Sequence, residues 1–265
     1  MKTWRLIDSG ASDAATNMAT DEALLGAYRP GASLPVLRLY GWRPAAFSIG
    51  LSQNPHHLLK TDSFVRRPTG GGLLFHDNEL TYSFVACASD IGVSLGVKES
   101  FAHITGFILE LYRALGLKAH FAKNTRRLMT RSPLIAALCL SRQEAYDIMV
   151  QGKKIGGHAQ KRVRHLILQH GTIPLSLHPE HFTKDLRDTA RHDLSGAASL
   201  LEVMRRRVFL RDLKNICGKA FCRHFGVTLH ITDLTPQEAR LMRQLRHEKY
   251  ATPAWNHHRK TPVHG

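Results

Sequence analysis

Two glycine-rich segments carry the residues of this chain that could do chemistry. The first, here called the glycine loop (residues 66–77), reads Arg-Arg-Pro-Thr-Gly-Gly-Gly-Leu-Leu-Phe-His-Asp. Three successive glycines predict a positive φ or a very close approach of the backbone. Arginine forks beside exposed backbone N–H groups are typical of an anion or oxyanion site, and a flexible hairpin loop is the open alternative. The candidate substrate-binding residues of this loop are Arg66, Arg67, Thr69, Gly70, Gly71, Gly72 and His76.

The glycine loop does not match the common nucleotide-binding loops. Residues 79–85 after it are expected to form a strand, whereas a triphosphate-binding loop needs Gly-Lys-Ser/Thr followed by a helix. The glycines also lack the spacing of the dinucleotide fingerprint. His76 either orders the loop by hydrogen bonding or is an ordinary structural histidine, and Leu73, Leu74 and Phe75 either line an acyl tunnel or belong to a core strand.

The second segment, here called the lysine segment (residues 151–162), places lysines between glycines. It reads Gln-Gly-Lys-Lys-Ile-Gly-Gly-His-Ala-Gln-Lys-Arg. A lysine ammonium held in a closely approached piece of backbone can hydrogen-bond a carbonyl or stabilise an oxyanion. A β-hairpin turn beside a solvated basic face is the alternative. The candidate residues here are Lys154, with a catalytic role, and Gly156 and Gly157, with a substrate-binding role.

One of the four cysteines is a candidate nucleophile. Cys139 follows the apolar run at residues 134–138 and precedes Lys154 by 15 residues, in a region whose cations could lower a thiol pKa. Cys87, Cys217 and Cys222 are expected to pack in the core. The histidines show no metal-ligand spacing, so we predict no metal site.

Composition and charge narrow the class of protein. The chain has 265 residues, with 37 Lys+Arg against 21 Asp+Glu and a formal charge of +16. Such an excess attracts acidic partners, and an acidic carrier protein fits better than nucleic acid, because no nucleic-acid module is recognisable. No apolar stretch is long enough to span a bilayer and the N-terminus lacks a signal-peptide core, so we expect a cytoplasmic protein without membrane contact.

The predicted elements indicate an α+β fold, with mixed or antiparallel sheets packed against helices. Strands are expected near residues 1–8, 36–40, 64–66, 80–86, 146–150, 154–157 and 166–177, with residues 46–51 as the hairpin partner of 36–40. Helices are expected at 13–28, at 100–115 with Ser100 as N-cap, and at 179–189, 201–225 and 236–250. The basic stretch 123–137 is expected to be a mobile loop. We predict a catalytic domain over 1–215 and a helical C-terminal segment over 216–265 that packs on the same domain.

With these segments in hand, the chain resembles the lipoate–protein ligases and octanoyltransferases, which are relatives of the biotin–protein ligase catalytic domain. The resemblance rests on five stretches in the order that this family shows. They are residues 17–25, residues 37–53, the Arg-Arg-x-Thr-Gly-Gly loop, the Lys-Ile-x-Gly lysine motif and the closing Lys-Tyr…Trp-Asn at 249–256. It implies the catalytic-domain fold of that family.

Within the family, the resemblance is greatest to the LipM-like octanoyltransferases, which use no ATP. In that subgroup a cysteine shortly before the lysine motif carries the octanoyl group as a thioester, in a Cys-Phe-x-x-x-x-x-Tyr-Glu context. Cys139 and Tyr146 have that spacing here, with Leu140 in place of Phe and Asp147 in place of Glu. The resemblance therefore implies that Cys139 and Lys154 are the catalytic residues.

The implied reaction moves an octanoyl group from octanoyl acyl carrier protein to a lysine of a lipoyl-domain protein, such as the glycine-cleavage H protein, without a cofactor and as a monomer. One alternative is an ATP-dependent lipoate–protein ligase, which needs ATP and Mg and would wrap Gly70–Gly72 around lipoyl-adenylate. A further alternative is amidotransfer between two lipoyl domains, which would also proceed through a cysteine thioester. A non-catalytic basic binding protein on the same fold is the alternative from another class.

Overall fold

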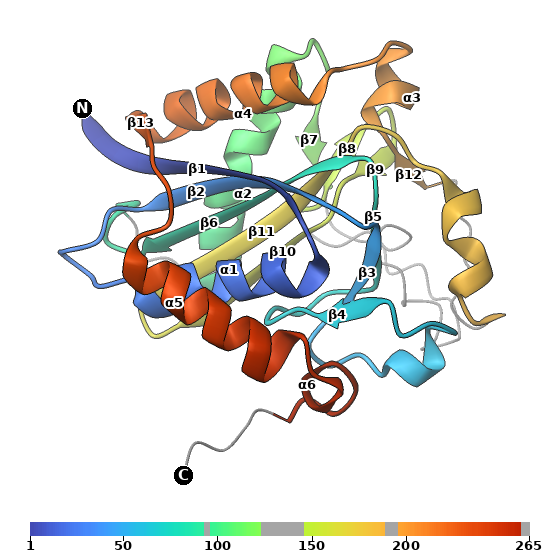
Figure 1. Ribbon diagram of the computed structural model, residues 1–265. Coiled ribbons are helices and arrows are strands. Elements are labelled where there is room, and N and C mark those ends of the chain that lie inside the picture. Colours follow the sequence, from blue (N-terminus) through green and yellow to red (C-terminus); the bar gives the residue numbers. More distant parts are fainter. Residues whose placement is uncertain (93–95, 123–145, 189–195, 261–265) are drawn as a thin grey trace.

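The computed structural model describes residues 1–92, 96–122, 146–188 and 196–260 (Figure 1). The basic stretch 123–137 lies outside these described residues. The strands are β1 (Lys2–Ser12), β2 (Val36–Trp42), β3 (Ala46–Ile49), β4 (Phe64–Arg66), β5 (Leu74–His76), β6 (Glu79–Cys87), β7 (His120–Phe121), β8 (Ile148–Val150), β9 (Lys153–Ile155), β10 (His158–Val163), β11 (Leu166–Pro174), β12 (Ala197–Ala198) and β13 (Val227–Ile231). The helices are α1 (Ala14–Ala27), α2 (Val97–Ala114), α3 (Leu200–Met204), α4 (Leu210–Phe225), α5 (Pro236–Leu245) and α6 (Pro253–His258).

A six-stranded mixed sheet forms the centre, in the order β10-β11-β6-β2-β1-β13. The pairs β1–β2 and β1–β13 are parallel, and the other three pairs are antiparallel. Helices α2 and α4 cover one face of this sheet, and α1 and α5 cover the other (Figure 1). This arrangement confirms the predicted α+β class.

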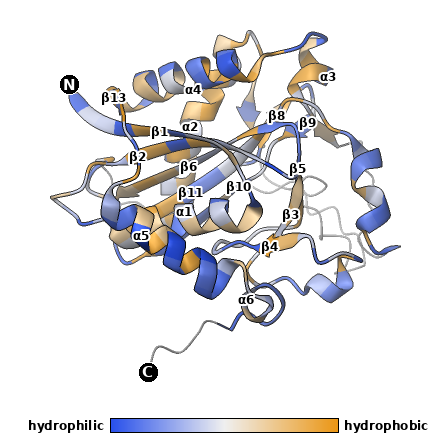
Figure 2. Cartoon of the chain, in the orientation of Figure 1, coloured by the Kyte–Doolittle hydropathy of each residue, from blue (hydrophilic) through white to orange (hydrophobic). Residues whose placement is uncertain are grey.

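Both faces of the central sheet are apolar because successive strand residues point to opposite sides. In β6, Phe84 packs with Trp4 and with Phe107 and Phe221 of α2 and α4. The next residue, Val85, packs in the cluster of α1 on the opposite face. The outer surfaces of α4 and α5 are mostly hydrophilic, as expected for helices with one buried face (Figure 2). No helix of the described chain is both long enough and apolar enough to cross a bilayer.

The expected hairpin between residues 36–40 and 46–51 is wrong. Strand β2 is flanked by β1 and β6, so both of its edges are already paired. Strand β3 instead lies in a separate three-stranded sheet, parallel to β4 and antiparallel to β5. This small sheet holds both ends of the glycine loop. A further sheet, in the order β12-β9-β8-β7, contains the start of the lysine segment.

Helical boundaries also differ from expectation at three places. Helix α2 begins at Val97 with Gly96 as N-cap, and the Ser100 hydroxyl bonds Val97 O inside the helix rather than capping it. Residues 179–189 form two short 3-10 turns, Pro179–His181 and Thr183–Asp185, in their described part. The expected single helix over residues 201–225 is wrong, because the chain forms two helices there, α3 and α4. Strand β13 follows α4 and joins the edge of the central sheet beside β1. The predicted division after residue 215 falls within α4 and stays a prediction.

The closing Lys-Tyr…Trp-Asn stretch locks the C-terminal helices onto α1. Lys249 Nζ and Tyr250 OH both donate to Glu22 Oε2 of α1, and the Lys249 ammonium lies 4.0 Å from the centre of the Trp255 ring. The charges of Lys249 and Lys161 hold the pKa of Glu22 below its usual range, although burial alone would raise it. A motif that is distant from the glycine loop in the sequence thus fixes the C-terminal helices against α1.

Candidate active site

Arg66 of the glycine loop is directed into the protein. It is 1% exposed, and its guanidinium donates to the carbonyls of Leu51 (2.9 Å), Gln53 (2.7 Å) and Asn256 (2.7 Å), among others. Its own carbonyl accepts from Trp255 Nε1 at 2.9 Å. These bonds tie β4 to α6, so the observed contacts of Arg66 are structural, and its predicted contact with substrate stays a prediction.

Arg67 holds the glycines of the loop in place. Its Nη1 donates to the carbonyl and hydroxyl oxygens of Ser48 at 2.8 and 2.7 Å, and its Nη2 donates to the carbonyls of Gly70 (3.1 Å) and Gly72 (2.8 Å). Between these carbonyls, Gly71 has φ +93°, in the left-handed region that favours glycine. Its carbonyl lies so near Gly50 that a Cβ at Gly50 would be 1.9 Å away from it. The expected close backbone approach is present, and it is an approach of the chain to itself.

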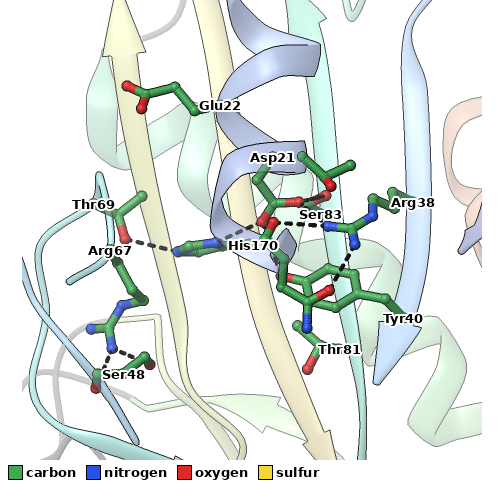
Figure 3. Close-up of polar contacts among 12 residues, drawn as sticks. Asp21, Glu22, Arg38, Tyr40, Ser48, Arg67, Thr69, Thr81, Ser83 and His170 are labelled. Atoms are coloured by element: carbon green, nitrogen blue, oxygen red, sulfur yellow. Dashed lines mark hydrogen bonds and ion pairs between the residues drawn. The ribbon is translucent and has the colours of Figure 1, made fainter. Parts of the chain in front are cut away.

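A buried chain of hydrogen bonds runs from α1 through β11 to the glycine loop (Figure 3). Asp21 Oδ2 lies 3.2 Å from His170 Nδ1, and His170 Nε2 lies 2.8 Å from Thr69 Oγ1. On its other side, Asp21 accepts from Arg38 Nη1 at 2.7 Å and from Ser83 Oγ at 2.7 Å. The chain therefore fixes the position of the Thr69 side chain relative to the central sheet.

The pKa values of these groups follow from their contacts. Burial alone would raise the pKa of Asp21, but bonds and charges from His170, Arg38 and Ser83 hold it below its usual range. Burial lowers the pKa of His170 despite the bond to Asp21. An ionised Asp21 and a neutral His170 give one consistent pattern: Nδ1–H donates to the carboxylate, and Nε2 accepts from the Thr69 hydroxyl.

His76 is held on three sides. Its Nε2 lies 2.6 Å from Ser48 Oγ and its Nδ1 lies 2.7 Å from Glu79 Oε1. Its ring stacks on Trp42, with a centroid separation of 3.9 Å and an angle of 9°. Because both ring nitrogens and one ring face have protein partners, the contacts of His76 in this structure serve to order the loop.

Lys154 is buried on β9 beside a carboxylate. It is 2% exposed, and its Nζ lies 2.8 Å from Oδ2 of Asp147, just before the antiparallel neighbour strand β8. A buried ammonium needs such a partner, and the pair keeps the charged form in place. Its neighbour Lys153 is more exposed and pairs with Glu202 of α3 at 2.6 Å. The two adjacent lysines therefore have different surroundings, and Lys154 is the one inside the protein.

The glycines after Lys154 bring β9 and β10 against β11. Gly156 has φ +83°, and a Cβ there would lie 2.1 Å from the carbonyl oxygen of Thr172. Gly157 N donates to Thr172 Oγ1 at 3.2 Å, and Thr172 N donates to Gly157 O at 2.9 Å. A side chain at residue 156 would push the lysine segment away from the central sheet.

A pocket lies where the two segments meet. It encloses about 350 Å³, including space open to solvent. Its lining residues are Met18, Tyr40, Trp42, Arg67, Gly71, Leu74, His76, Thr81, Gly157, His158, Ala159, His170, Gly171 and Thr172. Four of the predicted site residues thus line the same pocket: Arg67, Gly71, His76 and Gly157.

The other predicted residues lie around this pocket or outside the described chain. Cys139 falls within residues 123–145, outside the described residues, so its role as nucleophile stays a prediction. Of the three candidate tunnel residues, Leu74 lines the pocket, whereas Leu73 and Phe75 pack with Phe47 in the core of the small sheet. Six further predicted residues do not line the pocket: Arg66, Thr69, Gly70, Gly72, Lys154 and Gly156.

Several residues of the site were not predicted from the sequence. Asp21 and His170 were not assigned to it, and Asp147 was noted only for its spacing from Cys139. Asp21 sits on the buried face of a helix, where an unpaired charge is costly, and this position is the signal that could have singled it out. His170 gives no such signal, because its partners Asp21 and Thr69 come from two distant segments.

A group of polar residues on the surface lies apart from this pocket. His178, Glu180 and His181 have possible metal-ligand atoms within 4.8 Å of one another. His178 Nδ1 lies 3.2 Å from Glu180 Oε1, and His181 Nδ1 lies 2.8 Å from Asp77 Oδ2. These hydrogen bonds account for the arrangement, and we propose no metal site there.

Comparison with known proteins gives concordant results for sequence and fold. Residues 13–222 match the family described as Lipoyl protein ligase A/B catalytic domain. The chain is 37% identical to the octanoyltransferase LipM of Kyrpidia tusciae, over 97% of this chain and 99% of that protein. It is 32% identical to the octanoyltransferase LipM of Bacillus subtilis, again over 97% and 99%.

Solved structures share the fold at lower sequence identity. A lipoate-protein ligase A bound with ATP superposes with a TM-score of 0.79 at 22% identity, covering 97% of this chain and 98% of that one. A bipartite lipoate protein ligase from Thermoplasma acidophilum, described with its E2 lipoyl domain, gives a TM-score of 0.80 at 20% identity and covers both chains fully. The predicted fold class is confirmed.

Proposed function

Because the chain belongs to the lipoyl protein ligase A/B catalytic domain family, we propose that it is an octanoyltransferase of protein lipoylation. The observation that carries this proposal is the likeness to octanoyltransferases over nearly the whole of both chains. The geometry supports it, because a pocket with apolar lining residues adjoins the segment that holds a buried, ion-paired lysine. The donor is octanoyl acyl carrier protein and the acceptor is a lysine of a lipoyl domain, such as that of the glycine-cleavage H protein.

The reaction proceeds in two acyl transfers through Cys139. The thiolate of Cys139 attacks the carbonyl carbon of the carrier thioester, a new C–S bond forms, and the carrier leaves as a thiolate that takes up a proton. The neutral amine of the acceptor lysine then attacks the Cys139 thioester. An amide bond forms, the amine loses a proton, and Cys139 is released.

Lys154 stabilises the oxyanion of both tetrahedral intermediates. Its ammonium is already charged and positioned by Asp147, so no reorganisation is needed when negative charge develops. The backbone around Gly70–Gly72 and Gly156–Gly157 encloses the acyl group. The net charge of +16 attracts acidic carrier and lipoyl domains to the site.

The test is acylation of the protein itself without ATP. After incubation with octanoyl acyl carrier protein, intact mass spectrometry is expected to find one octanoyl group that hydroxylamine removes, and Cys139→Ala abolishes it. Cys87→Ala is the matched control, because Cys87 is a buried residue of β6 and the adduct should persist. A wild-type protein without the adduct, or an equally labile adduct on Cys139→Ala, contradicts the thioester route.

The same preparation separates the ligase alternative. ATP-dependent transfer of free octanoate or lipoate that survives Cys139→Ala would assign the chain to the lipoate–protein ligases instead. Transfer from an octanoylated lipoyl domain, rather than from the carrier, would indicate amidotransfer.

A further inference from the structure

His158, the first residue of β10, is placed on the pocket wall by its cross-strand neighbour. It pairs in register with Gly171 of β11. A Cβ built at Gly171 would lie 2.1 Å from His158 Nδ1 and 2.9 Å from the carbonyl oxygen of Gly157. The ring therefore occupies the space that a side chain at residue 171 would fill, and only glycine leaves room for it.

A chain of hydrogen bonds assigns the proton on this ring. Gln160 Nε2 donates to Gln169 Oε1 at 2.9 Å, so the amide nitrogen of Gln169 faces Thr105 Oγ1 (2.8 Å) and Tyr82 OH (3.4 Å). Because Tyr82 OH accepts from Gln169, its own proton is free to bond His158 Nδ1, which lies 3.1 Å away. Nδ1 is then an acceptor, and the proton of the neutral ring resides on Nε2.

The ring stays neutral over the physiological range. Burial lowers the pKa of His158 to about 3, with further lowering by the charge of Lys154. In this tautomer Nε2–H is a hydrogen-bond donor, and Nδ1, the basic nitrogen, is already bonded to Tyr82 OH. Its electrostatic neighbour Lys154 is itself a donor, so the two groups favour the same kind of ligand atom, one that accepts hydrogen bonds.

Nε2 of His158 has no hydrogen-bond partner among the described residues. Among the buried side-chain nitrogen and oxygen atoms of the described residues, it shares this condition with Tyr112 OH alone, and Tyr112 does not belong to the pocket lining. Leaving a buried donor without an acceptor costs about 1–3 kcal/mol. By contrast, His76 and His170, the other two histidines of the lining, have both ring nitrogens bonded.

We infer that His158 Nε2–H is the hydrogen-bond donor that this pocket offers to the carbonyl oxygen of a bound acyl group. The inference rests on the proposed octanoyl transfer for the identity of that acyl group. Apolar lining such as Met18, Leu74 and Ala159 suits the alkyl chain. A group that donates a hydrogen bond and does not take up a proton suits a carbonyl oxygen or the oxyanion formed from it. His158 is then a neutral donor in this pocket, and the charge of the nearby Lys154 acts on the same site.

The first test observes the donor directly in the wild-type protein. Two-bond ¹⁵N–¹H correlation spectra of the histidine rings should show His158 as the neutral Nε2–H tautomer down to about pH 4. Addition of octanamide, a neutral acyl probe without a leaving group, should shift the Nε2–H resonance downfield. An Nδ1–H tautomer, or an Nε2–H resonance that octanamide does not move, overturns the inference.

The second test compares variants. His158→Phe keeps a ring but removes the donor, and it should weaken octanamide binding by about tenfold, the equivalent of one hydrogen bond. It should also lower kcat/KM for octanoyl-pantetheine by at least that factor. His158→Gln places an amide N–H near the position of Nε2 and should recover most of both losses. His165→Phe is the matched control, an exposed histidine of the same hairpin, and should change neither.

The two proposals fail in different ways. If the wild type and His158→Phe transfer octanoyl groups equally well, the role of His158 is wrong and the octanoyltransferase assignment stands. If no transfer occurs but octanamide binding still depends on His158, the donor site stands and the proposed reaction is wrong. Should His158→Phe fail to fold, the wild-type spectra and the His158→Gln variant still decide the question.

Discussion

The glycine loop and the lysine segment have similar compositions, but their basic side chains have different partners in the folded protein. Both place two adjacent basic residues beside glycines, and both adopt positive φ values at glycines, at Gly71 in the first segment and at Gly152 and Gly156 in the second. In the glycine loop, the guanidinium groups of Arg66 and Arg67 donate to main-chain carbonyls of the protein itself. In the lysine segment, Lys154 pairs with a carboxylate, and Nε2 of the pocket-lining His158 has no partner among the described residues.

The difference shows that a basic, glycine-rich sequence does not by itself make an anion site. What decides is where each donor ends after folding, because a guanidinium with several carbonyl partners has little left to offer a ligand. The glycine loop thus supplies shape, since Arg67 holds it against the pocket. The lysine segment supplies the polar groups that can meet a substrate.

Replacing Lys154 should have the largest effect on activity. Lys154→Met removes the oxyanion donor and should lower kcat for octanoyl transfer by about 100- to 1,000-fold. Lys153→Met removes the adjacent, more exposed lysine and should stay within about threefold of the wild type, because its pair with Glu202 contributes no more than about 1 kcal/mol. Steady-state kinetics, with circular dichroism to verify folding, would check this. Equal losses in both variants would erase the distinction between the two lysines.

Replacing Arg66 should act on stability rather than on chemistry. Arg66→Ala leaves carbonyls of the loop after β3 and of α6 without donors, and should lower the free energy of unfolding by about 3 kcal/mol or more. Urea denaturation would measure it. Arg206→Ala, an exposed arginine between α3 and α4, should change this free energy by no more than about 0.5 kcal/mol.

An opposite result for Arg66 would be informative. If Arg66→Ala kept its stability and lost octanoyl binding, the arginine would contact the substrate, as the sequence alone suggested. The glycine loop would then also supply a polar group to the substrate, and the contrast with the lysine segment would be wrong.

The pH dependence of stability should come from the lysine segment and its neighbours, with the smallest effect. His158 and His170 are held neutral when folded, with pKa values below the ordinary 6.5, whereas in the unfolded chain they bind protons below about pH 6.5. The unfolding free energy should therefore fall as pH falls from 6.5 toward 3, by up to about 1.4 kcal/mol per pH unit for each proton. Asp21, whose pKa is lowered, adds a further loss only below its unfolded pKa near 4.

Urea denaturation between pH 7 and pH 4 would measure this slope. His158→Phe should reduce it by the share of one proton, and His165→Phe should leave it unchanged. The arginines of the glycine loop remain charged throughout this range and contribute nothing to it. A slope that His158→Phe does not alter would mean that His158 is as easily protonated in the folded protein as in the unfolded chain.

Local pattern was enough to predict most of the elements. The strand expected at residues 80–86 and the helix expected at 13–28 are present in the structure as β6 and α1, because both expectations rest on residues that are neighbours in the sequence. The hairpin between residues 36–40 and 46–51 failed because strand pairing depends on which edges other strands have taken. Strand β13 was missed for the same reason, since its partner β1 lies more than two hundred residues earlier.

The sequence by itself determined the family, the α+β class and the residues worth examining, because motif spacing and hydrophobic period are properties of neighbouring positions. Only the tertiary structure decided what those residues do. It directed Arg66 toward main-chain carbonyls, joined Lys154 to Asp147, linked Thr69 to Asp21 through His170, and left His158 Nε2 without a partner among the described residues. The physical reason is that a hydrogen bond depends on distances and angles among atoms that folding brings together from distant segments.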